Sequence, residues 1–130
     1  MSVGPVSGRN GIQIVLPQNY TCLWAAFTQA AYTINLTIKD GCGNVVVNQS
    51  GTGMNFNLLG AGNFVVSQAN TYTVYITANN GQDVSIIWGE SPLTRGSNVY
   101  SNTLNFVGED GADQDYNDIF LCISWFEYSH

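Results

Sequence analysis

The sequence predicts an all-β fold, an antiparallel β-sandwich of about nine strands. Apolar and polar residues alternate over residues 32–38 (Tyr-Thr-Ile-Asn-Leu-Thr-Ile), and residues 71–77 alternate in a similar way. Runs with a period of two are typical of strands in a sheet that has one wet face. Turn signals rich in Gly, Asn and Asp separate these runs at short intervals, as expected for a sandwich of short strands.

The strands follow one another along the whole chain. The expected strands cover residues 11–16, 20–28, 31–38, 43–48, 54–59, 62–67, 71–78, 82–89, 99–107 and 118–126. Turns are expected at 40–41, 51–53, 60–63 and 79–81, and the Asn-Asn-Gly at 79–81 gives the strongest hairpin signal. The Ala-rich stretch Cys22–Ala31 is compatible with a helix, but its flanking Tyr and Thr residues favour a strand.

Length and composition indicate one domain spanning residues 1–130. A chain of 130 residues with 45 % hydrophobic side chains can fill a single core. The N-terminal stretch has no apolar signal core, and no segment approaches membrane-spanning length. We therefore expect synthesis in the cytoplasm without a signal peptide, with non-classical release to the cell surface left open.

Charge excludes two classes of partner. Only 9 % of residues are charged, the formal net charge is −6, and there are three basic residues. Three scattered cations cannot replace the counterions of nucleic acid or hold an anionic membrane surface. A surface made mostly of uncharged polar groups resists association only weakly, so self-association is expected.

The three cysteines are an odd number and contain no C-x-x-C motif. Cys22 and Cys122 lie in apolar runs, which favours buried free thiols over a disulfide.

An acidic segment carries the chemistry. Five of the nine acids fall within residues 109–118, which contain no Lys or Arg. Calcium takes six to eight oxygen ligands, mainly carboxylates and amide carbonyls, and would offset the repulsion between these acids. The candidate ligands are Glu109, Asp113, Asp115, Asn117 and Asp118. The alternative is a solvated acidic turn, because Asp and Asn are good turn formers.

Other metals and catalysis are less consistent with these residues. Counted from Asp113, the spacing does not fit an EF-hand, and zinc is disfavoured because the chain has one His and widely spaced cysteines. A glycosidase needs two acids facing across a cleft, whereas these lie on one short segment. The single His, His130, ends the chain, which disfavours a nucleophile–His pair. We therefore expect a binding protein and not an enzyme.

The segment has the form E-D-G-x-D-x-D-Y-N-D over residues 109–118, followed by a strand that ends near Trp125. In this it resembles the calcium-dependent fucose- and mannose-binding lectins of bacteria, the LecB-like family. Residues 11–17, 25–27 and 104–106 are collinear with strands of that family, so the resemblance covers residues 11–126.

The resemblance implies two calcium ions side by side that bind sugar hydroxyls directly. It implies that one ion is held by Glu109, Asp113, Asp115 and Asp118, and the other by Asp115, Asn117 and Asp118. It also implies that the sugar meets Asp110 and Asp113, with Asp110 accepting a hydrogen bond from a hydroxyl. The sugar would be of the fucose or mannose type, and the protein a homodimer or tetramer.

The chain departs from the family at two places. Gln29 stands where the family has an Asn ligand, and Ala30 and Ala31 stand where it has a small polar loop that selects the sugar. The chain also continues past the family's terminal Gly, through residues 126–130, where Glu127 offers a substitute carboxylate. These departures keep a second interpretation open, in which calcium only stabilises a self-assembling protein of the same fold.

Overall fold

The computed structural model describes residues 3–66, 71–109 and 116–126. Within them it contains nine strands, all of whose pairings are antiparallel. The strands are β1 (Val3–Ser7), β2 (Ile12–Val15), β3 (Thr21–Lys39), β4 (Val45–Val65), β5 (Thr71–Ala78), β6 (Gln82–Asp83), β7 (Ser85–Arg95), β8 (Asn98–Glu109) and β9 (Ile119–Phe126). The described residues include no helix that could cross a lipid bilayer.

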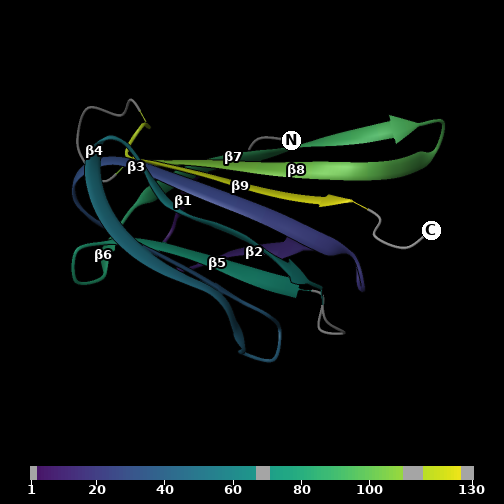
Figure 1. Cartoon of the computed structure of the whole chain (residues 1–130), viewed down its shortest axis with the longest axis horizontal. Helices are drawn as coiled ribbons and strands as arrows, with labels where there is room; N and C mark the ends of the chain where they lie inside the picture. The colour runs from purple at the N-terminus through teal and green to yellow at the C-terminus, as the bar shows by residue number, and fades with distance from the viewer. Residues whose placement is uncertain (1–2, 67–70, 110–115, 127–130) are drawn as a thin grey trace.

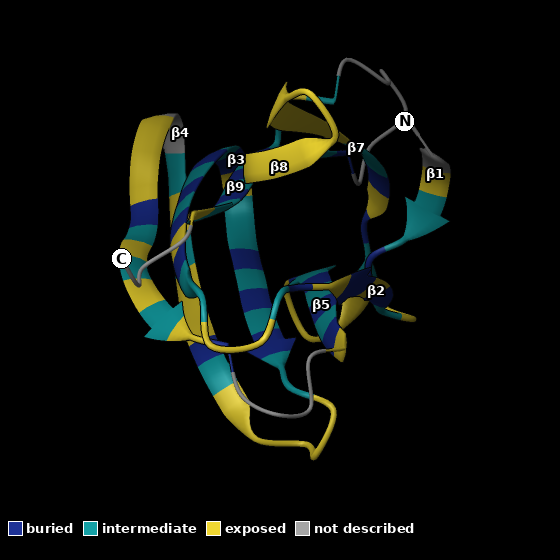
Figure 2. Ribbon diagram, turned by 90° about the vertical axis from the view of Figure 1, so that its right-hand side faces the viewer, coloured by how far each residue is buried: buried dark blue, intermediate teal, exposed yellow. Residues whose placement is uncertain are grey.

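The strands form one continuous sheet in the order β1-β7-β8-β9-β3-β5-β2, and β4 pairs with the other edge of β3. Figure 1 shows the hairpin of β7 and β8 reaching beyond the rest of the sheet. Seen along the strands, the sheet curls around a central core (Figure 2). The all-β, antiparallel prediction is therefore confirmed.

Strand β3 runs through both layers of the structure, which are two parts of one bent sheet. Its first half pairs with β9 up to Thr28, and its second half pairs with β5 from Ile34 onward. Between the two halves the register with β4 shifts at Thr28/Ala30 and again at Ala30/Ile34. Such bulges bend a strand and let it pass from one layer to the other.

The core lies on the inner side of this bent sheet. Alternate residues of β3 are buried through both halves, from Cys22 to Ala30 and from Ile34 to Ile38. Ile119, Leu121 and Ile123 of β9 continue the core, and each is at most 2 % exposed. Burying one such side chain contributes roughly 1.5–3 kcal/mol, so the core firmly positions β9, which follows the acidic segment, against β3.

Three details of the strand prediction are wrong. The strands expected at 20–28 and 31–38 are one strand, β3, and those expected at 43–48, 54–59 and 62–67 are the single strand β4. The glycines at 51–53 and 60–63 lie inside β4 and not in turns, because they pair with residues of β3, with register shifts between some of the pairs. Strand β1 is absent from the expected strands. Its Pro5 is tolerated because β1 is an edge strand, which among the described strands pairs with β7 alone.

Other predictions are confirmed. Residues 22–31 lie in β3, so the Ala-rich stretch is a strand. The turn at 79–81 joins β5 to β6, with Asn79 and Gly81 at positive φ. All three cysteines are free and Cys22 is buried, as expected; the expected burial of Cys122 is wrong in degree, since it is half-buried, and Cys42 is exposed.

Candidate functional site

The acidic segment joins β8 to β9 at one end of the sheet. Its middle, which contains the predicted site residues Asp110, Asp113 and Asp115, lies outside the described residues. Its two ends are described: Glu109 closes β8, and Tyr116, Asn117 and Asp118 lead into β9. The geometry of the site is therefore that of these two ends and of the parts of β3 that they contact.

Glu109 turns inward at the end of β8. It is only 4 % exposed, and its Oε1 accepts a hydrogen bond from the backbone N of Tyr116 at 3.2 Å. Burying an ionised carboxylate costs free energy unless other groups compensate its charge or hydrogen-bond it. A buried acid in the most acidic part of the chain is therefore a natural ligand for a cation.

The β8–β9 ladder brings Asp118 next to Glu109. Gly108 pairs with Ile119, and the backbone N of Asp118 donates to the carbonyl oxygen of Gly108 at 3.0 Å. Glu109 directly follows Gly108, and Asp118 directly precedes Ile119. The two acids therefore lie at the same end of two neighbouring strands. The ladder therefore brings two of the predicted ligands to the same end of the sheet.

Strand β3 holds Asp118 from the other side. The carbonyl oxygen of Asp118 accepts hydrogen bonds from the backbone N of Gln29 at 3.0 Å and from Oγ1 of Thr28 at 3.1 Å. The hydroxyl of Tyr32 donates to Oδ2 of Asp118 at 2.5 Å. Asp118 is therefore held by its main chain and by its side chain at once.

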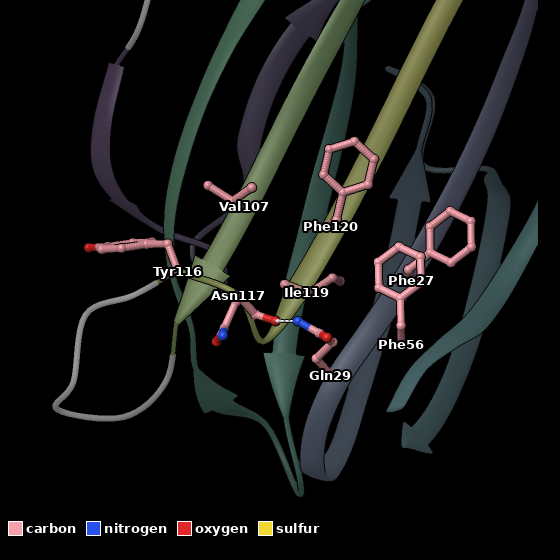
Figure 3. Close-up of a pocket in the computed structure, with 8 residues that line it drawn as sticks. All are labelled: Phe27, Gln29, Phe56, Val107, Tyr116, Asn117, Ile119 and Phe120. Atoms are coloured by element: carbon pink, nitrogen blue, oxygen red, sulfur yellow. Dashed lines mark hydrogen bonds between the residues drawn. The ribbon is translucent and has the colours of Figure 1, made fainter. Parts of the chain in front are cut away.

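The predicted site residues on β3 lie against the same end of the acidic segment. The side-chain amide of Gln29 donates from Nε2 to the carbonyl oxygen of Asn117 at 3.4 Å, and the side chain of Asn117 points away from Gln29 (Figure 3). Asn117 and Ala31 are exposed, whereas Ala30 is 2 % exposed and belongs to the core. Of the two alanines, therefore, only Ala31 presents its methyl group at the surface.

An apolar pocket of about 340 Å³ lies beside these residues. Asn117 and Gln29 form part of its wall, and the other lining residues are Phe27, Phe56, Val107, Tyr116, Ile119 and Phe120 (Figure 3). The rings of Phe27 and Phe56 stack with centroids 4.7 Å apart, and Phe56 is 57 % exposed. The polar end of the site thus borders an apolar surface formed by β3, β4, β8 and β9.

The described donors have the chemistry that calcium requires. Glu109 and Asp118 offer carboxylate oxygens and Asn117 offers an amide oxygen, and calcium binds all three types. Among the described residues no three His, Cys, Asp or Glu side chains gather at one point. A complete ion site would therefore draw on the acids between the two described ends.

Sequence reasoning missed two residues that hold the site. The sequence pattern indicates only that Thr28 and Tyr32 lie in strands, with Tyr32 as the first apolar member of an alternating run, yet their hydroxyls bond to Asp118. Asp118 lies 86 positions after Tyr32, and no local pattern pairs residues so far apart.

The chain is similar to known proteins over most of its length. The profile of the family described as fucose-binding lectin II (PA-IIL) matches residues 13–127. No curated protein sequence is similar enough to match the chain.

Three solved structures have a similar fold. A high-affinity mannose-binding lectin of Ralstonia solanacearum has 24 % identity and a TM-score of 0.76, with 87 % of this chain and 94 % of that chain covered. The Chromobacterium violaceum lectin CV2L, solved in complex with alpha-methyl-fucoside, has 26 % identity and a TM-score of 0.71 over the same shares. The C-terminal domain of the BC2L-C lectin of Burkholderia cenocepacia has 22 % identity and a TM-score of 0.75, with 96 % and 97 % covered.

Proposed function

The chain belongs to the fucose-binding lectin II family, and we propose that it is a carbohydrate-binding lectin whose sugar is held by bound calcium. The proposed sugars are monosaccharide units of the fucose or mannose type. Two of the similar structures are described as a mannose-binding lectin and as a lectin bound to a fucoside. We propose no catalytic turnover, because the work of such a site is to bind and release its sugar unchanged.

One observation carries the calcium part of the proposal. Glu109 is a buried carboxylate at the mouth of the acidic segment, and Asp118 is fixed beside it by the β8–β9 ladder. A cation bound at this end of the two strands would offset the repulsion between these carboxylates and the other acids of the segment. The remaining protein ligands of the proposal are Asp113, Asp115 and Asn117. Because each calcium ion takes six to eight oxygen ligands, water or sugar hydroxyls would fill the other positions.

The sugar would enter where the calcium ions keep water ligands. Calcium accepts neutral hydroxyl oxygens, so two neighbouring hydroxyls of a sugar can replace two waters. Asp110 and Asp113 are the proposed acceptors of hydrogen bonds from the sugar hydroxyls. On β3 the sugar would meet Ala31, which is exposed and lies two residues after Gln29. An alanine there offers apolar contact only, so this part of the site would contribute shape and not hydrogen bonds.

A calorimetric titration tests the function directly. Methyl α-L-fucoside and methyl α-D-mannoside are each titrated into the protein with calcium, and then with excess EDTA. Binding that needs calcium supports the proposal, and sugar binding that survives EDTA, or no binding of any glycoside, contradicts it. Asp115→Ala is expected to weaken calcium binding, whereas Asp83→Ala is the control, because Asp83 lies outside the acidic segment and accepts a hydrogen bond from Ser7.

A second function is favoured by a specific surface. Strand β4 pairs only with β3 among the described strands, and it exposes Phe56, Leu58 and Val65, each more than half exposed. An exposed apolar strand edge promotes association with another chain. The alternative is therefore a self-assembling protein that uses calcium for stability alone. It predicts a higher melting temperature with calcium but no response to any glycoside.

A further inference from the structure

Tyr32 occupies the bend of β3. The last pair of β3 with β9 is Thr28 with Ile119, and its first pair with β5 is Ile34 with Ala78. Tyr32 lies between these two ladders and is half-buried against the core. Its side chain therefore stands where the sheet changes layer, next to the start of β9.

The hydroxyl of Tyr32 and the carboxylate of Asp118 form a short hydrogen bond. Oη of Tyr32 is 2.5 Å from Oδ2 of Asp118. The phenol is the donor, since an ionised carboxylate can only accept. Hydrogen bonds between a hydroxyl and a charged carboxylate are short, about 2.5–2.7 Å, and stronger than neutral ones. This contact fixes the direction in which the carboxylate of Asp118 points.

The main chain of Asp118 is fixed by separate contacts. Its carbonyl oxygen accepts from Gln29 and Thr28, and its backbone N donates to Gly108. The residue thus has little freedom left in the backbone, and Tyr32 removes much of what remains in the side chain. A ligand oriented before the ion arrives loses less freedom on binding.

We propose that Tyr32 is a positioning residue for calcium: its hydroxyl holds the Asp118 carboxylate in the orientation that ligates the ion. This inference rests on the proposed function, since it assumes that Asp118 is a ligand. Each carboxylate oxygen has two lone pairs, so the hydrogen bond from Tyr32 does not by itself prevent the Asp118 carboxylate from binding an ion.

The test is the calcium affinity of Tyr32→Phe, measured by calorimetry on protein stripped of metal. Loss of a group that orients a metal ligand typically lowers affinity about 10- to 100-fold, and we expect a loss in that range. The dissociation rate of calcium, followed by rapid mixing with a fluorescent chelator, is expected to rise accordingly. Tyr75→Phe is the matched control, because Tyr75 is a half-buried tyrosine on β5 whose ring lies under the amine of Lys39.

The outcomes separate this inference from the function on which it rests. If the unmodified protein binds no calcium, the proposed function fails. If it binds calcium and Tyr32→Phe binds it within about twofold of that affinity, which lies well below the expected range, the positioning role of Tyr32 is overturned. A lower melting temperature of calcium-free Tyr32→Phe with unchanged calcium affinity would assign the hydroxyl to folding alone, and also overturns it. Should Tyr32→Phe not fold, 4-fluorophenylalanine at position 32 keeps a ring of similar size without a donor, and the same two affinities decide.

Discussion

The carboxylate of Glu109 and the backbone N of Tyr116 are joined by a hydrogen bond of 3.2 Å that closes the two ends of the acidic segment on each other. The acceptor is a buried group at the end of β8, and the donor precedes β9. One contact therefore links the strand that enters the segment to the strand that leaves it. Because the same carboxylate is a proposed calcium ligand, its charge and its acceptor role can be tested separately.

Glu109→Gln is expected to reduce calcium affinity while the fold is retained. Glutamine keeps an oxygen that can accept the hydrogen bond from the backbone N of Tyr116, but it removes one negative charge from the ligands of the ion. Calorimetry on the metal-free protein measures the change. Glu90→Gln is the control, since Glu90 is exposed on β7 and accepts a hydrogen bond from Asn102 at 2.8 Å. Equal calcium affinities of the two variants would contradict the role of Glu109.

Gly60→Val is expected to destabilise the fold. A Cβ at position 60 would lie 2.8 Å from Cη2 of Trp24 and 3.2 Å from Cγ of Gln49. Trp24 is 7 % exposed and packed in the core, so it has little room to withdraw. Overpacking of this kind typically costs about 1–3 kcal/mol.

The measurement for position 60 is chemical unfolding, with Ala61→Val as the control. Ala61 is the next residue of β4 and is exposed, so a larger side chain there meets solvent. The free energy of unfolding should fall for Gly60→Val and change little for Ala61→Val. A Gly60→Val protein as stable as the unmodified one would show that the packing of Trp24 does not require a glycine at position 60.

The cysteines are expected to react with a thiol reagent at very different rates. Burial raises the pKa of the Cys22 thiol to about 12, so almost none of it is the reactive thiolate at pH 8. Cys42 is exposed in the turn between β3 and β4. Reaction with a disulfide reagent at pH 8 should therefore label Cys42 quickly and Cys22 only after unfolding. Rapid labelling of Cys22 in the folded protein would contradict its burial.

Leu58→Asp is expected to weaken self-association. Leu58 is 55 % exposed on β4, an edge strand that also exposes Val65. A charge on this edge opposes pairing with a second copy. Light scattering coupled to size exclusion measures the mass in solution, with Val15→Asp on β2 as the control for an exposed valine elsewhere. A Leu58→Asp protein with the mass of the unmodified one would remove β4 from the interface.

The sequence predicts the fold class well because burial imposes a period of two on strands such as β3 and β5. It predicts strand boundaries less well where glycines occur. Gly60 lies within the β3–β4 ladder, and it is a glycine because Trp24 occupies the space that a side chain would need. A local pattern cannot distinguish this use of glycine from a turn, because the partner is on another strand.

The candidate site divides in the same way. Glu109 and Asp118 are evident in the sequence from the density of acids around them. Tyr32 and Thr28 are not evident, since their role depends on the bend of β3 that brings them to Asp118. A high density of carboxylates in the sequence indicates a cation site, whereas the groups that orient those carboxylates can be identified only from the fold.

The central claim is that divalent cations neutralise the acidic segment in the folded protein. Native mass spectrometry on protein equilibrated with excess calcium tests it most directly. The account predicts two calcium ions bound to each folded chain, both removed by a chelator. A folded chain that carries no calcium under these conditions would contradict it.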